Sequence, residues 1–137
     1  MLLNHPLYEG DFLCYHEHMR ITLLSKHVDV SDALTSFIEG KFSPLSKQLR
    51  RFEKEGSDLL LRIEIARTTR HHKKGEVYYI EATLQLPGKL LRIEHHDENI
   101  RKGVTAAKNR LKEVIVEHIE KEQNIDQKKI RSKKSII

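Results

Sequence analysis

The sequence of 137 residues has no run of apolar residues long enough to cross a membrane. A membrane-spanning helix needs about 18 or more consecutive apolar residues, whereas 33% of the residues here are charged. The N-terminus also lacks the basic segment and the apolar stretch of a secretory signal. These absences predict a cytoplasmic protein that has no membrane partner.

Cysteine is nearly absent, since Cys14 is the only one. A single cysteine excludes a disulfide within the chain and a cysteine cluster for a metal, and it suits a reducing compartment. His71-His72 and His95-His96 are paired in sequence, but neighbours on a strand point to opposite faces and no helical His-x-x-x-His accompanies them. We therefore expect no metal and no cofactor. A metal-dependent enzyme that uses these histidine pairs is the less favoured alternative.

Motifs of covalent and nucleotide chemistry are missing too. The sequence has no serine between glycines at a nucleophile elbow, no glycine-rich loop that would cradle a phosphate, and no recognisable pair of carboxylates for a catalytic cleft. The chain is therefore predicted not to be an enzyme and to have no small-molecule substrate.

Basic charge is what the sequence has in excess. Lysine and arginine number 25 against 20 acidic residues, which gives a formal net charge of +5. This balance favours a polyanionic partner such as nucleic acid.

The chain is expected to form one domain, because 137 residues with 38% hydrophobic content can bury one modest core. Residues 1–18 contain Pro6 and Gly10 and show no sustained period, so they are predicted to be an N-terminal arm or an upstream extension. Residues 19–122 are predicted to be the folded domain. Residues 123–137 carry five cations without a helical apolar stripe, which predicts a flexible basic tail.

Alternation of apolar and polar residues predicts four strands, at residues 19–26, 59–66, 77–86 and 89–94. The last two belong to the stretch EATLQLPGKLLRIE, in which Pro87-Gly88 is predicted to form the turn of a hairpin.

Two helices are predicted from apolar residues at three- and four-residue spacing. The first should begin at the N-cap Ser31 and be bent or broken at Pro44. Its stripe consists of Leu34, Ile38, Phe42, Leu45, Leu49 and Phe52. The second should be capped by Asp97. Its stripe consists of Ile100, Val104, Ala107, Leu111, Val114 and His118.

The order of these elements predicts an α+β fold, a β-α-β-β-β-α sandwich with two helices packed on one face of a four-stranded, mainly antiparallel sheet.

Basic residues gather on the exposed flanks of both helices and in one loop. On the first helix, Lys47, Arg50, Arg51 and Lys54 lie mostly opposite the stripe, with Lys41 nearer its edge. On the second, Arg101, Lys108 and Lys112 share one flank, whereas Lys102 and Arg110 lie on other faces. Arg67, Arg70, Lys73 and Lys74 crowd the loop before residue 77. Two basic flanks side by side predict a groove for phosphates.

The segments HVDVSDALTSFIEGKF and EATLQLPGKLLRIE, together with the capped terminal helix, resemble the ribosome hibernation promoting factors, also called ribosome-associated translation inhibitors. The likeness spans Met19 to Gln123. It implies binding to the small ribosomal subunit and its ribosomal RNA in the decoding region. It also implies that such binding inhibits translation by occluding messenger RNA and transfer RNA, without making or breaking a bond.

Lys41 and Arg110 match basic positions of that family. Pro44 stands where the family usually has a lysine, and Glu113 and Glu117 stand where its second helix is usually basic. The resemblance is to a short form, which is expected to be monomeric off the ribosome. The competing interpretation within nucleic-acid binding is a general double-stranded RNA module. The predicted RNA-binding residues are Lys41, Lys47, Arg50, Arg51, Arg70, Lys73, Lys74, Arg101, Lys108, Arg110 and Lys112.

Overall fold

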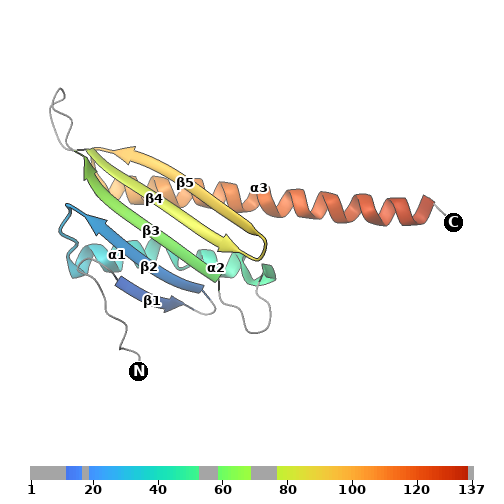
Figure 1. The fold of residues 1–137 in the computed structure, drawn as a ribbon, viewed down its shortest axis with the longest axis horizontal. Coiled ribbons are helices and arrows are strands. Elements are labelled where there is room, and N and C mark those ends of the chain that lie inside the picture. The colour runs from blue at the N-terminus through green and yellow to red at the C-terminus, as the bar shows by residue number, and fades with distance from the viewer. Residues whose placement is uncertain (1–11, 17–18, 53–58, 69–76, 136–137) are drawn as a thin grey trace.

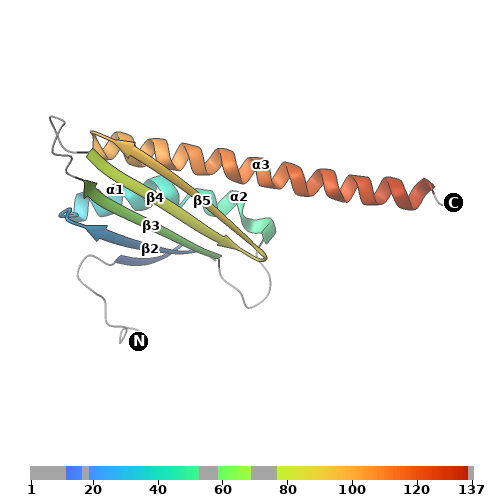
Figure 2. The same ribbon diagram turned by 45° about the horizontal axis from the view of Figure 1, so that its top comes forward.

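The computed structural model describes residues 12–16, 19–52, 59–68 and 77–135. These residues form one sheet with the helices lying over one of its faces (Figures 1 and 2). Along the chain the elements are β1 (Phe12–His16), β2 (Met19–Lys26), α1 (Asp32–Phe42), α2 (Leu45–Gln48), the 3₁₀ turn η2 (Arg50–Phe52), β3 (Leu59–Thr68), β4 (Val77–Leu86), β5 (Lys89–Asp97) and α3 (Ile100–Ser135).

The strands of the sheet follow the order β1-β2-β3-β4-β5. β2 and β3 are parallel, with Ile21 opposite Leu61, and every other pair in the described sheet is antiparallel. A parallel pair needs a long crossover, and α1, α2 and η2 lie in the connection between β2 and β3. The predicted mainly antiparallel α+β sandwich is confirmed, and all four predicted strands are present.

The hairpin between β4 and β5 turns where the sequence predicts it. Leu86 pairs with Lys89, so Pro87 and Gly88 are the two central residues of the turn. Gly88 has a φ of 73°. A type II turn requires a positive φ at its third position and favours proline at its second. The proline and the glycine therefore fix the register of β4 and β5.

α1 begins and ends as predicted. The Ser31 hydroxyl accepts a hydrogen bond from the backbone N–H of Leu34 at 3.1 Å, which confirms Ser31 as the N-cap. The helix ends at Phe42, and a separate short helix, α2, follows Pro44. Proline lacks the N–H that would continue the helix and crowds the preceding turn, so the interruption has its cause in the sequence.

The predicted cap of the last helix is wrong. The side-chain oxygen of Asn99 accepts a hydrogen bond from the Lys102 N–H at 3.0 Å, so Asn99 caps α3. Asp97 instead accepts a hydrogen bond from the Asn99 N–H at 2.9 Å, and this bond lowers the pKa of the Asp97 carboxyl. Both residues are good caps, and β5 continues through Asp97, which leaves Asn99 in the capping position.

Gly103 lets the first turn of α3 approach the sheet closely. A Cβ at this position would lie 2.4 Å from Cδ1 of Ile80 and 3.1 Å from Cβ of Asp97. Ile80 is itself fully buried, so its side chain has little room to yield. The glycine thus sets how tightly the helix packs on β4 and the end of β5.

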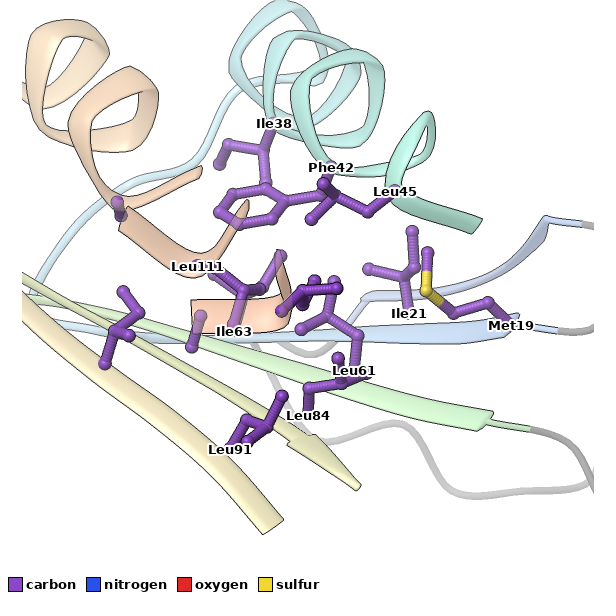
Figure 3. Packing of buried hydrophobic residues seen from close by; sticks show 14 of the residues in the cluster. Met19, Ile21, Ile38, Phe42, Leu45, Leu61, Ile63, Leu84, Leu91 and Leu111 are labelled. Carbon is purple, nitrogen blue, oxygen red and sulfur yellow. The ribbon is translucent and has the colours of Figure 1, made fainter. Parts of the chain in front are cut away.

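The core lies between the sheet and the helices (Figure 3). Ile38 and Phe42 of α1 and Leu111 of α3 meet Leu61 and Ile63 of β3, and all five are at most 2% exposed. The predicted stripe of α1 and α2 is buried at every position. The stripe of α3 is shifted slightly from the prediction.

The shift places Ile115 at the centre of the buried face of α3, where it is fully buried. Val114 and His118, which the predicted stripe includes, are only half-buried. The apolar residue that the prediction omitted therefore anchors the last packed turn.

Two segments are more regular than the sequence predicts. The N-terminal arm contains β1, which pairs with β2 and adds a fifth strand. The tail from residue 123 was expected to be flexible, whereas α3 stays helical to Ser135. The domain boundaries at residues 19 and 123 remain predictions. In the part of the chain that the structure describes, no helix combines the length and the apolar character needed to cross a membrane.

Candidate nucleic-acid interface

Phe37 brings basic side chains of α1 and α3 together. The guanidinium carbon of Arg101 lies 4.9 Å from the centre of the Phe37 ring, and Nζ of Lys41 lies 5.4 Å from it. A ring within about 6 Å attracts a cation through its quadrupole. Two positive groups from helices far apart in sequence are thus held at one place despite their mutual repulsion.

A second aromatic residue links the other end of this helix pair. The Phe52 ring stacks on the His118 ring of α3, with centres 5.5 Å apart and planes 28° apart. The guanidinium carbon of Arg51 lies 5.6 Å from the centre of the same ring. Phe52 therefore ties η2 to α3 and places the Arg51 cation close to that junction.

The other predicted cations lie on α3 and on the two short helices that follow α1, with Lys47 in α2 and Arg50 in η2. Lys108 and Lys112 follow Arg101 by seven and eleven residues, which at about 100° per residue keeps all three on one flank of α3. Because Arg101 contacts Phe37 of α1, this flank faces α1. We call the set the helix-pair surface. Its cations are Lys41, Lys47, Arg50, Arg51, Arg101, Lys108 and Lys112.

Most of these cations are open to solvent. Lys47, Arg50, Arg51, Arg101 and Lys112 are exposed, while Lys41 and Lys108 are half-buried. The Lys108 ammonium contacts the side-chain oxygen of Asn109 at 3.4 Å. Long cationic side chains in this setting can reach phosphates at little cost in buried area.

Arg110 does not join the helix-pair surface. It follows Arg101 by nine residues, which places it about half a turn around α3. Its guanidinium also pairs with Glu113 at 3.3 Å, and both side chains are exposed. Arg110 matches a basic family position, but the geometry gives it a different face from the other α3 cations.

Three predicted residues, Arg70, Lys73 and Lys74, lie outside the described residues, as does Lys54. Arg67, at the start of that predicted basic loop, lies in β3, where its guanidinium carbon is 5.9 Å from the centre of the Tyr78 ring. The structure therefore shows where the helix cations lie, and the loop cations remain an expectation.

Phe37 is the residue that the sequence prediction missed. It is half-buried and packs against the core without belonging to the central stripe. The available signal was its position four residues before Lys41, which puts the ring and the ammonium on one face of a helix. Nothing in the spacing, however, indicated that Arg101 would approach the same ring.

A shallow hollow on α3 contains Glu113 and Glu117, the two acidic residues at positions where the family is usually basic. It is lined by Asn109, Lys112, Glu113, Val116 and Glu117. Two carboxylates beside Lys112 reduce the positive potential there. The strongest basic character of α3 on this side thus lies toward Arg101 and Lys108.

The opposite face of the sheet has its carboxylates paired with neighbouring groups. Arg92 donates hydrogen bonds to Glu81 at 2.8 Å and to Glu94, and the Tyr79 hydroxyl donates to both carboxylates. These bonds, the one from Arg92 above all, lower the pKa of Glu81 to about 2. Burial and the same two carboxylates raise the pKa of Tyr79. On β2 and β3, Lys26 pairs with Glu64 at 2.8 Å.

Replacing Glu81 with Gln should make the free energy of unfolding depend less on pH between pH 2 and pH 6. The folded-state pKa of Glu81 lies below its ordinary value of 4.5. Its ionised form therefore stabilises the fold above about pH 4.5, and this contribution is lost as the pH falls toward 2. Urea midpoints measured from pH 2 to pH 6 should differ between Glu81→Gln and the natural protein at pH 6 and converge near pH 2. The exposed Glu120→Gln is the control, and a constant difference at all pH values would contradict the assignment.

No metal centre emerges from the described residues, because no three His, Cys, Asp or Glu side chains among them are placed to hold an ion. His95 instead contacts Asp97 at 3.3 Å, and the His96 ring lies against the Tyr79 ring with centres 5.0 Å apart. His71 and His72 lie outside the described residues.

Comparison with known families decides the relationship. The family model described as sigma 54 modulation protein / S30EA ribosomal protein matches residues 21–123, about three quarters of the chain. The chain belongs to this family. The resemblance to ribosome hibernation promoting factors is thereby confirmed. A search among curated proteins gave no match.

The comparison with solved structures gives one that supports the fold. The chain is similar to the N-terminal domain of Protein Y from Thermus thermophilus, with 20% identity and a TM-score of 0.51, covering 68% of this chain and 90% of that one. A ribosomal subunit interface protein from Coxiella burnetii matches at 19% identity and a TM-score of 0.49, covering 72% of this chain and 94% of that one. At such identity the Thermus structure supports the fold alone.

The matched region contains the whole helix-pair surface. It begins in β2 and ends at Gln123, just beyond the last turn of α3 that packs on the core. The S30EA family domain therefore includes Phe37 and its two cations, and the rest of α3 extends past it.

Proposed function

We propose that this S30EA family protein binds the small ribosomal subunit in the decoding region and inhibits translation by occupying the space of messenger RNA and transfer RNA. The observation that carries the proposal is the Phe37 ring with Lys41 and Arg101 on it, which joins the basic flanks of α1 and α3. The family is ribosome-associated, and its members act as factors rather than as enzymes.

The helix-pair surface suits ribosomal RNA for a physical reason. Phosphate contacts supply most of the affinity of proteins for nucleic acid, and cations displaced from the RNA drive the binding. On this surface the cations are mostly exposed, whereas Glu64, Glu81 and Glu94 on the other face of the sheet are engaged by neighbouring side chains. The helix side is thus the better face for a polyanion.

Inhibition requires no chemistry in this proposal. A folded domain seated where messenger RNA and transfer RNA would lie blocks both by exclusion, and only its affinity and position matter. The binding should therefore compete with both ligands and should weaken steeply with salt.

The test is sedimentation of the purified full chain with small subunits at low salt. We expect it to move with the subunits, to lower their capacity for transfer RNA, and to inhibit translation in a purified system at similar concentrations. Plain duplex RNA of equal mass is the comparison, because a general double-stranded RNA module recognises A-form shape without the ribosome.

Two results would count against the proposal. If all of the protein remained in the ribosome-free fraction, ribosome binding would be excluded. Equal affinity for duplex RNA and for small subunits would favour the general RNA module instead.

A further inference from the structure

The last turns of α3 leave the folded domain. Ile119 still packs against the core and Glu122 is half-buried, but every residue from Gln123 to Arg131 is exposed. Figures 1 and 2 both show this end of α3 extending past the sheet and the other helices. We call residues 123–135 the arm. Apart from Gln123, it also lies beyond the region that the family model matches.

The arm is helical although none of its side chains from Gln123 to Arg131 is buried. An isolated helix of this length is marginal in water, mainly because its first turn is costly to form. Here the packed part of α3 supplies that first turn, and the segment after Gly103 contains no glycine or proline that would interrupt the helix. The arm therefore continues an existing helix, and its charges point in a defined direction from the domain.

Charge changes sign along this end of α3. Glu120 and Glu122, with Lys121 between them, lie next to the domain, and Lys128, Lys129 and Arg131 follow after Asp126. At about 100° per residue, Lys128 and Arg131 lie about 60° apart and Lys129 lies about 100° from Lys128, so the three cations share roughly one half of the helix surface. A helix with these cations on one half of its surface can place them against a row of phosphates.

We propose that the arm is a second RNA-binding element and that Lys128, Lys129 and Arg131, three of its five cations, contact ribosomal RNA phosphates away from the helix-pair surface. Lys128 follows Arg101 by 27 residues. At 1.5 Å per residue they are about 40 Å apart along α3. The proposal rests on ribosome binding as proposed above. It adds a second contact with ribosomal RNA, made by the arm.

The helix dipole alone does not account for Lys128 and Lys129. Positive side chains do stabilise the C-terminal end of a helix, but the effect falls off within the last turn. Lys128 lies seven residues, about two turns, before Ser135. Its charge therefore contributes little to the stability of the helix and is available to a partner.

The experiment compares three variants of the full chain on purified small subunits over a salt series. The arm variant carries Lys128→Gln, Lys129→Gln and Arg131→Gln. The control carries Arg62→Gln, Lys89→Gln and Lys102→Gln, which removes the same charge from exposed positions outside both proposed contacts. The third variant, Asn124→Pro, keeps every cation and breaks the helix at the base of the arm.

The arm variant should lose about tenfold or more in affinity, and its salt slope should become shallower by about 2 to 3 for three phosphate contacts. The control should keep the natural slope. Asn124→Pro should also weaken binding, because the cations are then no longer held in one direction. Circular dichroism should show a folded domain in all three.

Each contrary result has its own meaning. An arm variant that behaves like the control would overturn the proposal, and natural affinity in Asn124→Pro would show that a tethered charge suffices without a helical arm. Self-association that Ile125→Gln with Ile130→Gln abolishes would assign the arm to a second copy of the chain. If the natural protein failed to bind subunits, the proposed ribosome binding would be rejected. The affinity of the same variants for a plain RNA hairpin would then show separately whether the arm binds RNA.

Discussion

Replacing the seven cations of the helix-pair surface with glutamine should reduce affinity for the small subunit by about a thousandfold or more at low salt, with the fold intact. The variant changes Lys41, Lys47, Arg50, Arg51, Arg101, Lys108 and Lys112. None of the seven belongs to the buried core, so little apolar area is lost.

The size of this effect follows from counterion release. Each phosphate contact contributes about 0.7 to 0.9 to the salt slope, so seven contacts contribute about 5 to 6. A protein with that many contacts loses about 10³ to 10⁵ in affinity between roughly 50 and 200 mM salt. The variant should therefore bind more weakly, and its affinity should depend less steeply on salt. Affinity is measured on purified subunits, with circular dichroism as the check on folding.

Controls separate contact from general charge. The triple variant of Arg62, Lys89 and Lys102 removes exposed cations elsewhere and should keep the natural slope. Phe37→Leu keeps every charge and removes only the ring on which Lys41 and Arg101 lie, so it should weaken binding modestly without changing the slope. A folded seven-site variant with natural affinity and slope would show that these cations are only a solvated surface.

The fold was predictable because its main signals are local. Alternation gives β2 to β5, the stripe with Ser31 and Pro44 gives α1 and α2, and the Pro87-Gly88 turn fixes the hairpin. Each of these depends on residues within a few positions of one another. The layered arrangement follows once the apolar faces must cover each other.

The elements that were predicted incorrectly depend on a choice between two equally suitable residues or on contacts made in the folded protein. Asp97 and Asn99 are equally good caps by type, and the end of β5 decides between them. β1 has no clear period of its own, and it is a strand because β2 offers an edge to pair with. The arm lacks an apolar stripe, and the helix that precedes it keeps it helical.

The candidate site was predictable in composition and only partly in geometry. Helical spacing correctly placed Arg101, Lys108 and Lys112 on one flank of α3. The contact of Arg101 with Phe37 of α1 depends on how two helices pack, which neither stretch specifies alone. Arg110 matches a family position, yet it lies on another face and pairs with Glu113.

Leu111→Ala should destabilise the protein by about 2 to 5 kcal/mol, the range for truncating a buried leucine. Leu111 is fully buried at the point where α3 meets the other helices and the sheet, as Figure 3 shows. The truncation removes apolar contacts with both layers and leaves a cavity that rigid strands on one side can hardly fill. A domain of this size has roughly 5 to 15 kcal/mol of stability in total.

The matched control is Leu90→Ala, the same chemical change at a residue that is 57% exposed. It should alter the free energy of unfolding by no more than about 0.5 kcal/mol. Both values come from urea unfolding followed by circular dichroism. Equal effects in the two variants would contradict the packing described. A loss confined to Leu111→Ala would show that docking of α3 holds the fold, and docking of α3 is also what brings Arg101 to Phe37 and Lys41.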